Sequence, residues 1–227
     1  MPNGDLPGCA MMCTDVRHVG PVSAHLPGDP DRIRVVMVRA APSPTRADTP
    51  PVSHQDTIAA FRSAGYNVSS LDDINSLGVY VTTAVKCPKI GFGVKQETVE
   101  ACSHLLEAEI DALPNVRSIL LMGNTAIRAI NAIAERRFGA PAIPVGSAYK
   151  VKGYEYPFGA ISLFPSYPES GRNLSVEGNR QDVIAVDIRN AITVAGGPLT
   201  RPHITRPKRG QHPTRPQPHA VGGSGDN

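Results

Sequence analysis

The side chains of this sequence best suited to chemistry are its four cysteines, which fall into two pairs. Cys9 and Cys13 lie near the start of the chain, whereas Cys87 and Cys102 lie in its middle. The N-terminus has no basic start followed by an apolar run, so we expect no secretory signal and no oxidising compartment in which disulfides would form. Spaced thiols then favour metal ligation, and the step from Cys87 to Pro88 is typical of iron-sulfur ligand runs. The cysteines predict one shared iron-sulfur or zinc site, with four small core residues as the alternative.

The elements that must position these residues alternate along the middle of the chain. Short apolar runs indicate strands over 34–38, 79–85, 118–122 and 159–164, and helical patterns cover 55–64, 95–113, 124–138 and 179–194. Strands that alternate with helices imply a parallel sheet covered on both faces. The sequence therefore predicts an α/β domain built on four parallel strands.

Loops at the carboxyl edge of such a sheet form its ligand site, because the strand ends converge there. The loops in question are 40–52, 82–95 and 165–173. A fourth segment, from Met122 to Thr125, combines a strand end, a glycine turn and a helix N-cap. This combination suits a small anion site, although it also serves as an ordinary helix cap.

Composition divides the chain into three parts. With 227 residues and 41% hydrophobic content, it can bury one core. We expect an irregular arm over 1–31, a domain over 32–195 and a disordered tail rich in Pro and Arg over 196–227. No apolar run approaches the length of a membrane span, so no membrane partner is predicted and the expected location is cytoplasmic.

The tail is the most basic part of a chain whose net charge is only +3. Proline keeps such a segment extended, which suits sequence-independent contacts with phosphates, and a solubilising extension is the alternative. Its basic residues are Arg201, Arg206, Lys208, Arg209 and Arg215.

Three segments together resemble the iron-sulfur uracil-DNA glycosylases, a branch of the uracil-DNA glycosylase superfamily that includes family 4. They are Val79–Cys87, Glu97–Cys102 and Leu120–Ile127. In that family a strand runs into a valine-lysine-cysteine step, and the next helix carries another cluster cysteine. The resemblance extends from Cys9 to Ile192. It implies a three-layer αβα sandwich around a central four-stranded parallel sheet, a pocket for a flipped base in DNA, and a 4Fe-4S cluster on the four cysteines.

The resemblance also maps the family's catalytic loop onto this chain. Its glycine-acid-alanine-proline-glycine loop aligns with Arg39–Ser43, which puts Ala40 at the position of the acid and makes Arg39 and Ala41 candidate base-binding positions. The family's stacking aromatic residue aligns with Pro51. We therefore expect no carboxylate to handle water at position 40 and weaker stacking on a base.

Two further family positions differ in residue type. The asparagine that reads the uracil edge aligns with Thr83, which offers one hydroxyl instead of an amide. The histidine of the histidine-proline-serine motif aligns with Pro168, which cannot donate a hydrogen bond to a departing base. Nearby groups that are candidates to substitute are Arg39, Asp48, His54, Asp56, Tyr167, Glu169 and Arg172. Tyr167 comes first among them because it lies inside the matched motif, and loop solvation is the alternative role for all of them.

These positions support three hypotheses about function. The first is a glycosylase-like protein that recognises a base in DNA, damaged bases and single-stranded DNA included, and excises uracil poorly. The second is a non-catalytic iron-sulfur module that binds nucleic acid and keeps the glycosylase fold. The third is a zinc-stabilised α/β protein of unrelated function.

Overall fold

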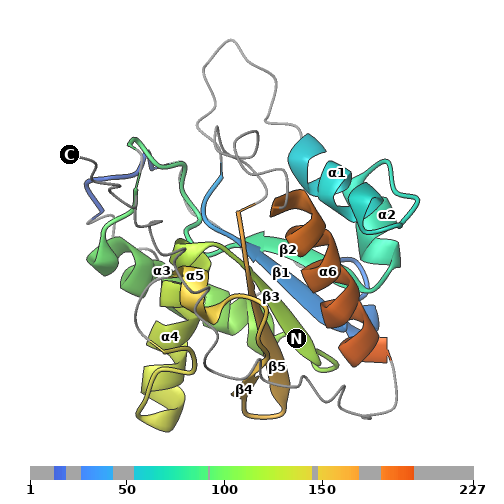
Figure 1. Cartoon of the computed structure of the whole chain (residues 1–227). Coiled ribbons are helices and arrows are strands. Elements are labelled where there is room, and N and C mark those ends of the chain that lie inside the picture. Colours follow the sequence, from blue (N-terminus) through green and yellow to red (C-terminus); the bar gives the residue numbers. More distant parts are fainter. Residues whose placement is uncertain are drawn as a thin grey trace, which may run out of the picture.

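The computed structural model describes residues 13–18, 27–42, 54–91, 93–144, 148–168 and 180–196. At its centre lies a five-stranded sheet with the strand order β2-β1-β3-β5-β4 (Figure 1). Strands β1 (Val35–Arg39), β2 (Val79–Thr83), β3 (Ser118–Met122) and β5 (Ile161–Ser166) are parallel, and β4 (Tyr156–Phe158) runs antiparallel to β5. The four predicted parallel strands are confirmed, and the sheet has one strand more than predicted.

The central strands β1 and β3 are apolar over four consecutive residues each because helices cover both faces of the sheet. In β1, Val36 and Val38 face one hydrophobic cluster, whereas Val35 and Met37 face the other. All five residues of β3 are buried. This pattern is typical of parallel sheets, in which neither face meets solvent.

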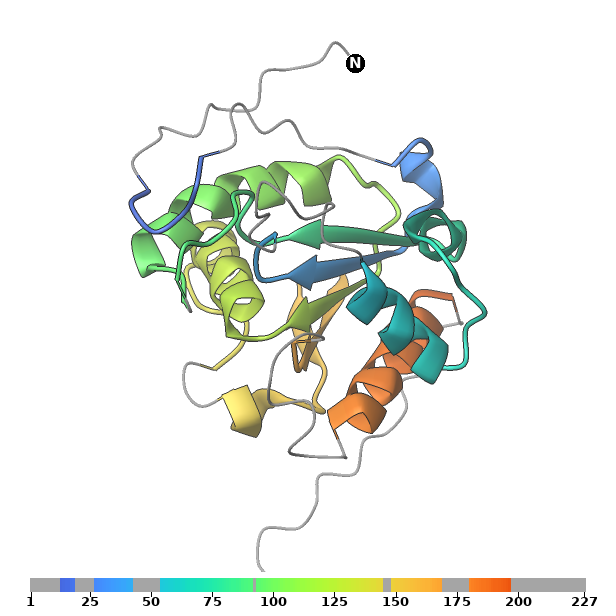
Figure 2. The same ribbon diagram turned by 90° about the horizontal axis from the view of Figure 1, so that it is seen from above.

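Two groups of helices form the outer layers, as the view from above shows (Figure 2). Helices α3 (Gln96–Asp111) and α4 (Asn124–Phe138) cover one face. Helices α1 (Gln55–Ser63), α2 (Leu71–Ser76) and α6 (Arg180–Gly196) cover the other. The predicted three-layer αβα sandwich is confirmed. None of the described helices is long and apolar enough to cross a membrane.

The remaining described elements are short, and the sequence patterns did not predict them. They are the 3-10 helix η1 (Pro30–Arg32), helix α5 (Ala148–Val151) and strand β4. Strand β4 contains Pro157, which lacks a backbone donor and is tolerated because β4 lies at the edge of the sheet. Helix α2 was also missed, although Ser70 and Asp73 form a capping box at its start.

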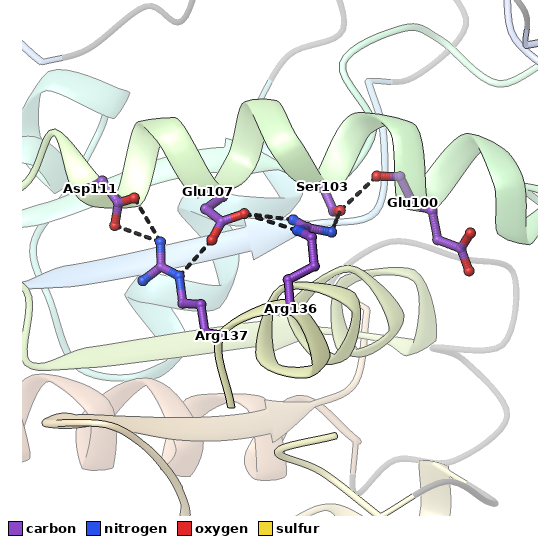
Figure 3. Close-up of polar contacts among 6 residues, drawn as sticks. All are labelled: Glu100, Ser103, Glu107, Asp111, Arg136 and Arg137. Carbon is purple, nitrogen blue, oxygen red and sulfur yellow. Dashed lines mark hydrogen bonds and ion pairs between the residues drawn. The ribbon is translucent and has the colours of Figure 1, made fainter. Parts of the chain in front are cut away.

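Helices α3 and α4 are joined by a group of charged side chains (Figure 3). Arg137 donates to Glu107 at 2.6 Å and to both carboxylate oxygens of Asp111 at 2.7 Å. Arg136 donates to Glu107 at 2.7 Å and to the hydroxyl of Ser103 at 2.9 Å. These bonds fix α3, the helix that carries Cys102, against α4.

Candidate active site

The ends of β1 and β2 bring together several positions that the family resemblance selected. Arg39 and Thr83 end these strands as register partners. Just beyond them, the Ala84 N–H donates to the Arg39 carbonyl at 2.7 Å and the Val85 N–H donates to the Ala40 carbonyl at 3.0 Å. These two bonds turn the chain after Thr83 instead of continuing β2 to Val85 as predicted. The backbone around position 40 is therefore held directly by the loop that follows β2.

A second pair of predicted residues meets at the same edge. Arg39 lies 3.3 Å from His54, measured from Nη1 to Nδ1, and His54 immediately precedes α1. A guanidinium can only donate, so this contact requires Nδ1 to accept and places the proton of a neutral imidazole on Nε2. Asp56 lies in the first turn of α1. The substitutes proposed from sequence therefore include one pair in contact.

Tyr167 directly follows β5 and is flanked by two cations. The Lys152 ammonium lies 3.3 Å from the centroid of the tyrosine ring, and the Arg180 guanidinium carbon lies 5.1 Å from it. Cations over an aromatic face are attracted by its electron density. Lys152 follows α5 and Arg180 begins α6, so the ring joins two segments that are distant in sequence.

Pro168 is exposed and packs over the turn between β3 and α4. A Cβ atom placed on Gly123 would lie 3.4 Å from the Pro168 ring, and Gly123 itself has a φ of +89°. The Gly123 N–H also donates to the Ser166 carbonyl at 3.1 Å. The predicted glycine turn therefore lies beside the motif loop after β5, at the carboxyl edge.

A buried ion pair lies behind the end of β2. Lys86 and Glu109 are joined at 2.7 Å, and their side chains are only 5% and 4% exposed. The Lys86 ammonium also donates to the Thr82 hydroxyl at 3.0 Å and to the Thr83 carbonyl at 2.7 Å. The Thr82 hydroxyl donates to the same Glu109 oxygen at 2.6 Å. Burial lowers the pKa of Lys86, although the nearby Glu109 carboxylate opposes this.

Burial raises the pKa of the neighbouring Tyr80 to about 12, and the charge of Glu109 adds to this effect. Tyr80 therefore stays protonated beside the ion pair. Lys86 belongs to the valine-lysine-cysteine step noted in the sequence, but no role was predicted for it. Glu109 was not predicted at all. The available signal was a single acid on the apolar face of α3, next to Ile110 and three positions after Leu106.

A second buried polar group lies at the end of β5. Ser166 is fully buried and Asp187, on α6, is 3% exposed. Within the described part of the chain, neither the Ser166 hydroxyl nor Oδ2 of Asp187 forms a well-aligned hydrogen bond, although the hydroxyl lies near enough to the carboxyl to affect its pKa. Burial raises the pKa of Asp187 to about 6, while the Ser166 hydroxyl and the Lys152 charge lower it in part. Neither residue was predicted, although an acid among the buried residues Ile184, Ala185 and Ile188 was a visible signal.

The fold and the strand-end geometry agree with a comparison against known families. The family model described as the Uracil DNA glycosylase superfamily matches residues 30–187. The chain belongs to this superfamily. The match runs from the segment before β1 to Asp187 on α6, so it includes every strand and the strand ends described above.

A curated relative within the superfamily is the type-5 uracil-DNA glycosylase of Thermus thermophilus. It is 29% identical to this chain over 101 residues, which are 44% of this chain and 46% of the relative. This chain therefore matches less than half of the length of that enzyme. The comparisons confirm the expected superfamily, whereas its iron-sulfur branch stays a prediction.

Three of the candidate cluster ligands, Cys13, Cys87 and Cys102, lie where the described N-terminal segment contacts the α/β domain. Residue Val16 forms an antiparallel bridge with Lys89, and the Arg17 N–H donates to the Pro88 carbonyl at 2.8 Å. These contacts place the segment that begins at Cys13 beside the one that begins at Cys87. Cys13 packs against the same hydrophobic cluster that contains Cys87 and Cys102.

Asp15 ties this segment to the start of α3. Its carboxylate accepts from the Lys95 N–H at 2.6 Å and from the Thr98 hydroxyl at 2.5 Å. Burial acts to raise the pKa of Asp15, but the bonds from Thr98 and Lys95 outweigh it and hold that pKa below its usual value. The contact links residues about 80 positions apart and sits one turn before Cys102.

Within the described residues, no disulfide joins Cys13, Cys87 and Cys102 to one another. Across the ranges that the structure describes, no three Cys, His, Asp or Glu side chains are grouped as a metal site. Thiols from three segments that pack on one cluster of side chains have the chemistry for iron or zinc. Other predicted residues lie outside the described residues, namely Cys9, Asp48, Pro51, Glu169, Arg172 and the basic residues of the tail.

Proposed function

We propose that this chain is a uracil-DNA glycosylase-like protein that recognises a base in DNA and excises uracil slowly. The observation that carries the proposal is the meeting of β1 and β2 at Ala40 and Thr83, inside the region matched by the superfamily. Base recognition uses groups fixed on rigid strand ends. Here a backbone hydrogen bond from Val85 holds Ala40, and the Lys86 ammonium holds the carbonyl of Thr83.

Slow excision follows from the residue types at the family's catalytic positions. Ala40 has no carboxylate, Thr83 has no amide, and Pro168 has no donor. If the motif's proline-serine is instead aligned with Pro165 and Ser166, its histidine position falls on Phe164, which is 5% exposed and also lacks a donor. The loss of one preorganised donor lowers turnover by roughly 100- to 1000-fold.

Polar groups remain at this edge that support recognition. The Arg39–His54 pair and the Tyr167 ring with its two cations lie after β1 and β5. Cations contact phosphates, and Lys152 already lies over the Tyr167 ring, so this group supports contact with the DNA backbone. We therefore assign base contact to Arg39, Ala41, Pro51 and Thr83, and keep Tyr167 as the candidate catalytic group. We also assign a DNA partner, single-stranded DNA included.

An excision assay tests this proposal. Oligonucleotides carrying uracil, hypoxanthine or xanthine are incubated with the wild type and with the variant Ala40→Glu/Thr83→Asn/Pro168→His. Uracil excision should be absent or very slow in the wild type and faster in the variant. Rapid uracil turnover by the wild type would contradict the reading and assign the chemistry to other residues, of which Tyr167→Phe would be the first to test.

We further propose that Cys9, Cys13, Cys87 and Cys102 hold a 4Fe-4S cluster, with zinc as the alternative metal. The support is the tethering of the Cys13 segment to Lys89 and to the start of α3. When bound, such a cluster would join the N-terminal segment to the sheet, and this would also suit a non-catalytic binding module.

Iron, sulfide and zinc contents of anaerobically purified protein decide between the metals, and Cys102→Ser should reduce the metal content. Absence of both metals would contradict the proposal.

The tail tests the DNA partner in a separate way. Truncation after Gly197 removes its five basic residues and should lower affinity for different DNA sequences about equally, with a flatter salt dependence. Unchanged affinity and salt dependence would restrict the DNA contacts to the folded domain.

A further inference from the structure

The buried ion pair of Lys86 and Glu109, at the end of β2, makes more hydrogen bonds than charge neutralisation requires. The Lys86 ammonium has three donors, and these meet Glu109, the Thr82 hydroxyl and the Thr83 carbonyl at 2.7, 3.0 and 2.7 Å. Its hydrogen-bonding capacity is therefore filled. One of the three acceptors is main chain, at the last residue of β2, so the lysine fixes backbone as well as a carboxylate.

The backbone that Lys86 fixes leads directly to the catalytic loop of the superfamily. Between Thr83 and Lys86 lie Ala84 and Val85, whose N–H groups hold the carbonyls of Arg39 and Ala40. The hydrogen bond from the Lys86 ammonium to the Thr83 carbonyl therefore closes the short turn over residues 83–86. The N–H groups of Ala84 and Val85, inside that turn, hold the end of β1. Loss of the ammonium would release the Thr83 carbonyl and loosen both amides.

Glu109 extends the same contact to the outer layer. It lies on α3, seven residues after Cys102, and Lys86 immediately precedes Cys87. The buried pair therefore connects the strand ends to the helix and the loop that carry two candidate ligands. A buried ion pair is seldom the most stable choice, since apolar residues of similar size often stabilise as well or better. The presence of the pair is therefore better explained by a role in positioning the backbone than by a gain in stability.

We propose that Lys86 and Glu109 are a positioning pair that fixes the ends of β1 and β2 for base recognition. The part concerning recognition rests on the proposed function, whereas the part concerning the strand ends does not. Neither residue contacts the base. The pair acts through the Thr83 carbonyl and through the amides of Ala84 and Val85.

The experiment uses the full-length Lys86→Met/Glu109→Leu variant, which replaces the pair with apolar side chains. Arg137→Met is the matched control, because it removes two ion pairs, with Glu107 and Asp111, that join α4 to α3 and not to the strand ends. The first measurement is amide hydrogen exchange of Ala84 and Val85. In the double variant these amides should exchange on the order of tenfold faster or more, at a melting temperature close to that of the wild type. The control should leave their exchange unchanged.

The second measurement is the ratio of affinities for oligonucleotides with and without uracil. The double variant should lose most of any preference that the wild type has. Unchanged exchange of Ala84 and Val85 in a stably folded double variant would overturn the proposal. If the wild type shows no base preference, the proposed function fails, but the exchange measurement still decides the positioning role. Should the double variant not fold, Lys86→Met alone takes its place with the same expectation, since it removes the donor to the Thr83 carbonyl.

Discussion

Asp187 supplies the sharpest test of the structure, because its buried carboxyl couples stability to pH. Its pKa is raised from the usual 3.8 to about 6, chiefly by burial. A folded-state pKa above the unfolded-state value means that the neutral carboxyl favours folding. The resulting stabilisation is complete below the unfolded-state pKa and is lost as pH rises through about 6. Asn, which keeps the shape but never ionises, should remove this dependence.

The magnitude follows from the two pKa values. Their difference corresponds to about 3 kcal/mol of stability between strongly acidic and alkaline conditions. Between about pH 5 and about pH 8 the rest of the chain is easier to keep folded. Over that interval the contribution of Asp187 to the free energy of unfolding falls by roughly 1.4 kcal/mol. The variant Asp187→Asn should therefore gain that amount relative to the wild type over the same interval.

Urea denaturation at several pH values measures the effect. The comparison is the change with pH in the difference between variant and wild type, which removes effects common to both proteins. Asp182→Asn, at an exposed carboxyl of the same helix, is the control and should keep the pH dependence of the wild type. If Asp187→Asn also keeps it, the carboxyl does not titrate as a buried group and the reasoning is refuted. Ser166→Ala should raise the pKa of Asp187 further, because the hydroxyl normally lowers it.

Two other substitutions test the fold. Arg137→Ala should lower the free energy of unfolding by about 0.5 to 1 kcal/mol, and by less in high salt, because its pairs with Glu107 and Asp111 are partly exposed. Denaturation at two salt concentrations measures this, and an effect independent of salt would contradict the assignment. Gly123→Ala should cost about 1 to 3 kcal/mol, since φ is +89° there and the Pro168 ring lies close. Gly28→Ala, where no positive φ is required and nothing lies nearby, should be nearly neutral in the same measurement.

The sequence by itself determined the class of the fold and the approximate place of the site. Runs such as Val35–Val38 and Ile119–Met122 are apolar at every position, and only a strand buried on both faces accommodates this. The helical pattern over 124–138 matched α4 at both ends, because Gly123 and Gly139 mark its limits. The order of strands and helices then placed the loops after β1, β2 and β5 at one edge.

Tertiary structure decided which side chains meet there. No local pattern pairs Lys86 with Glu109, because the two are 23 residues apart and joined only when α3 packs on the sheet. The same holds for Asp187, whose pKa is raised by burial and lowered in part by the Ser166 hydroxyl and the Lys152 charge. Strand β4 was missed for a related reason, since three residues with a central proline form a strand only when β5 offers its edge. Periodicity records which face of an element is buried, whereas polar partners are chosen by long-range packing that a single sequence does not display.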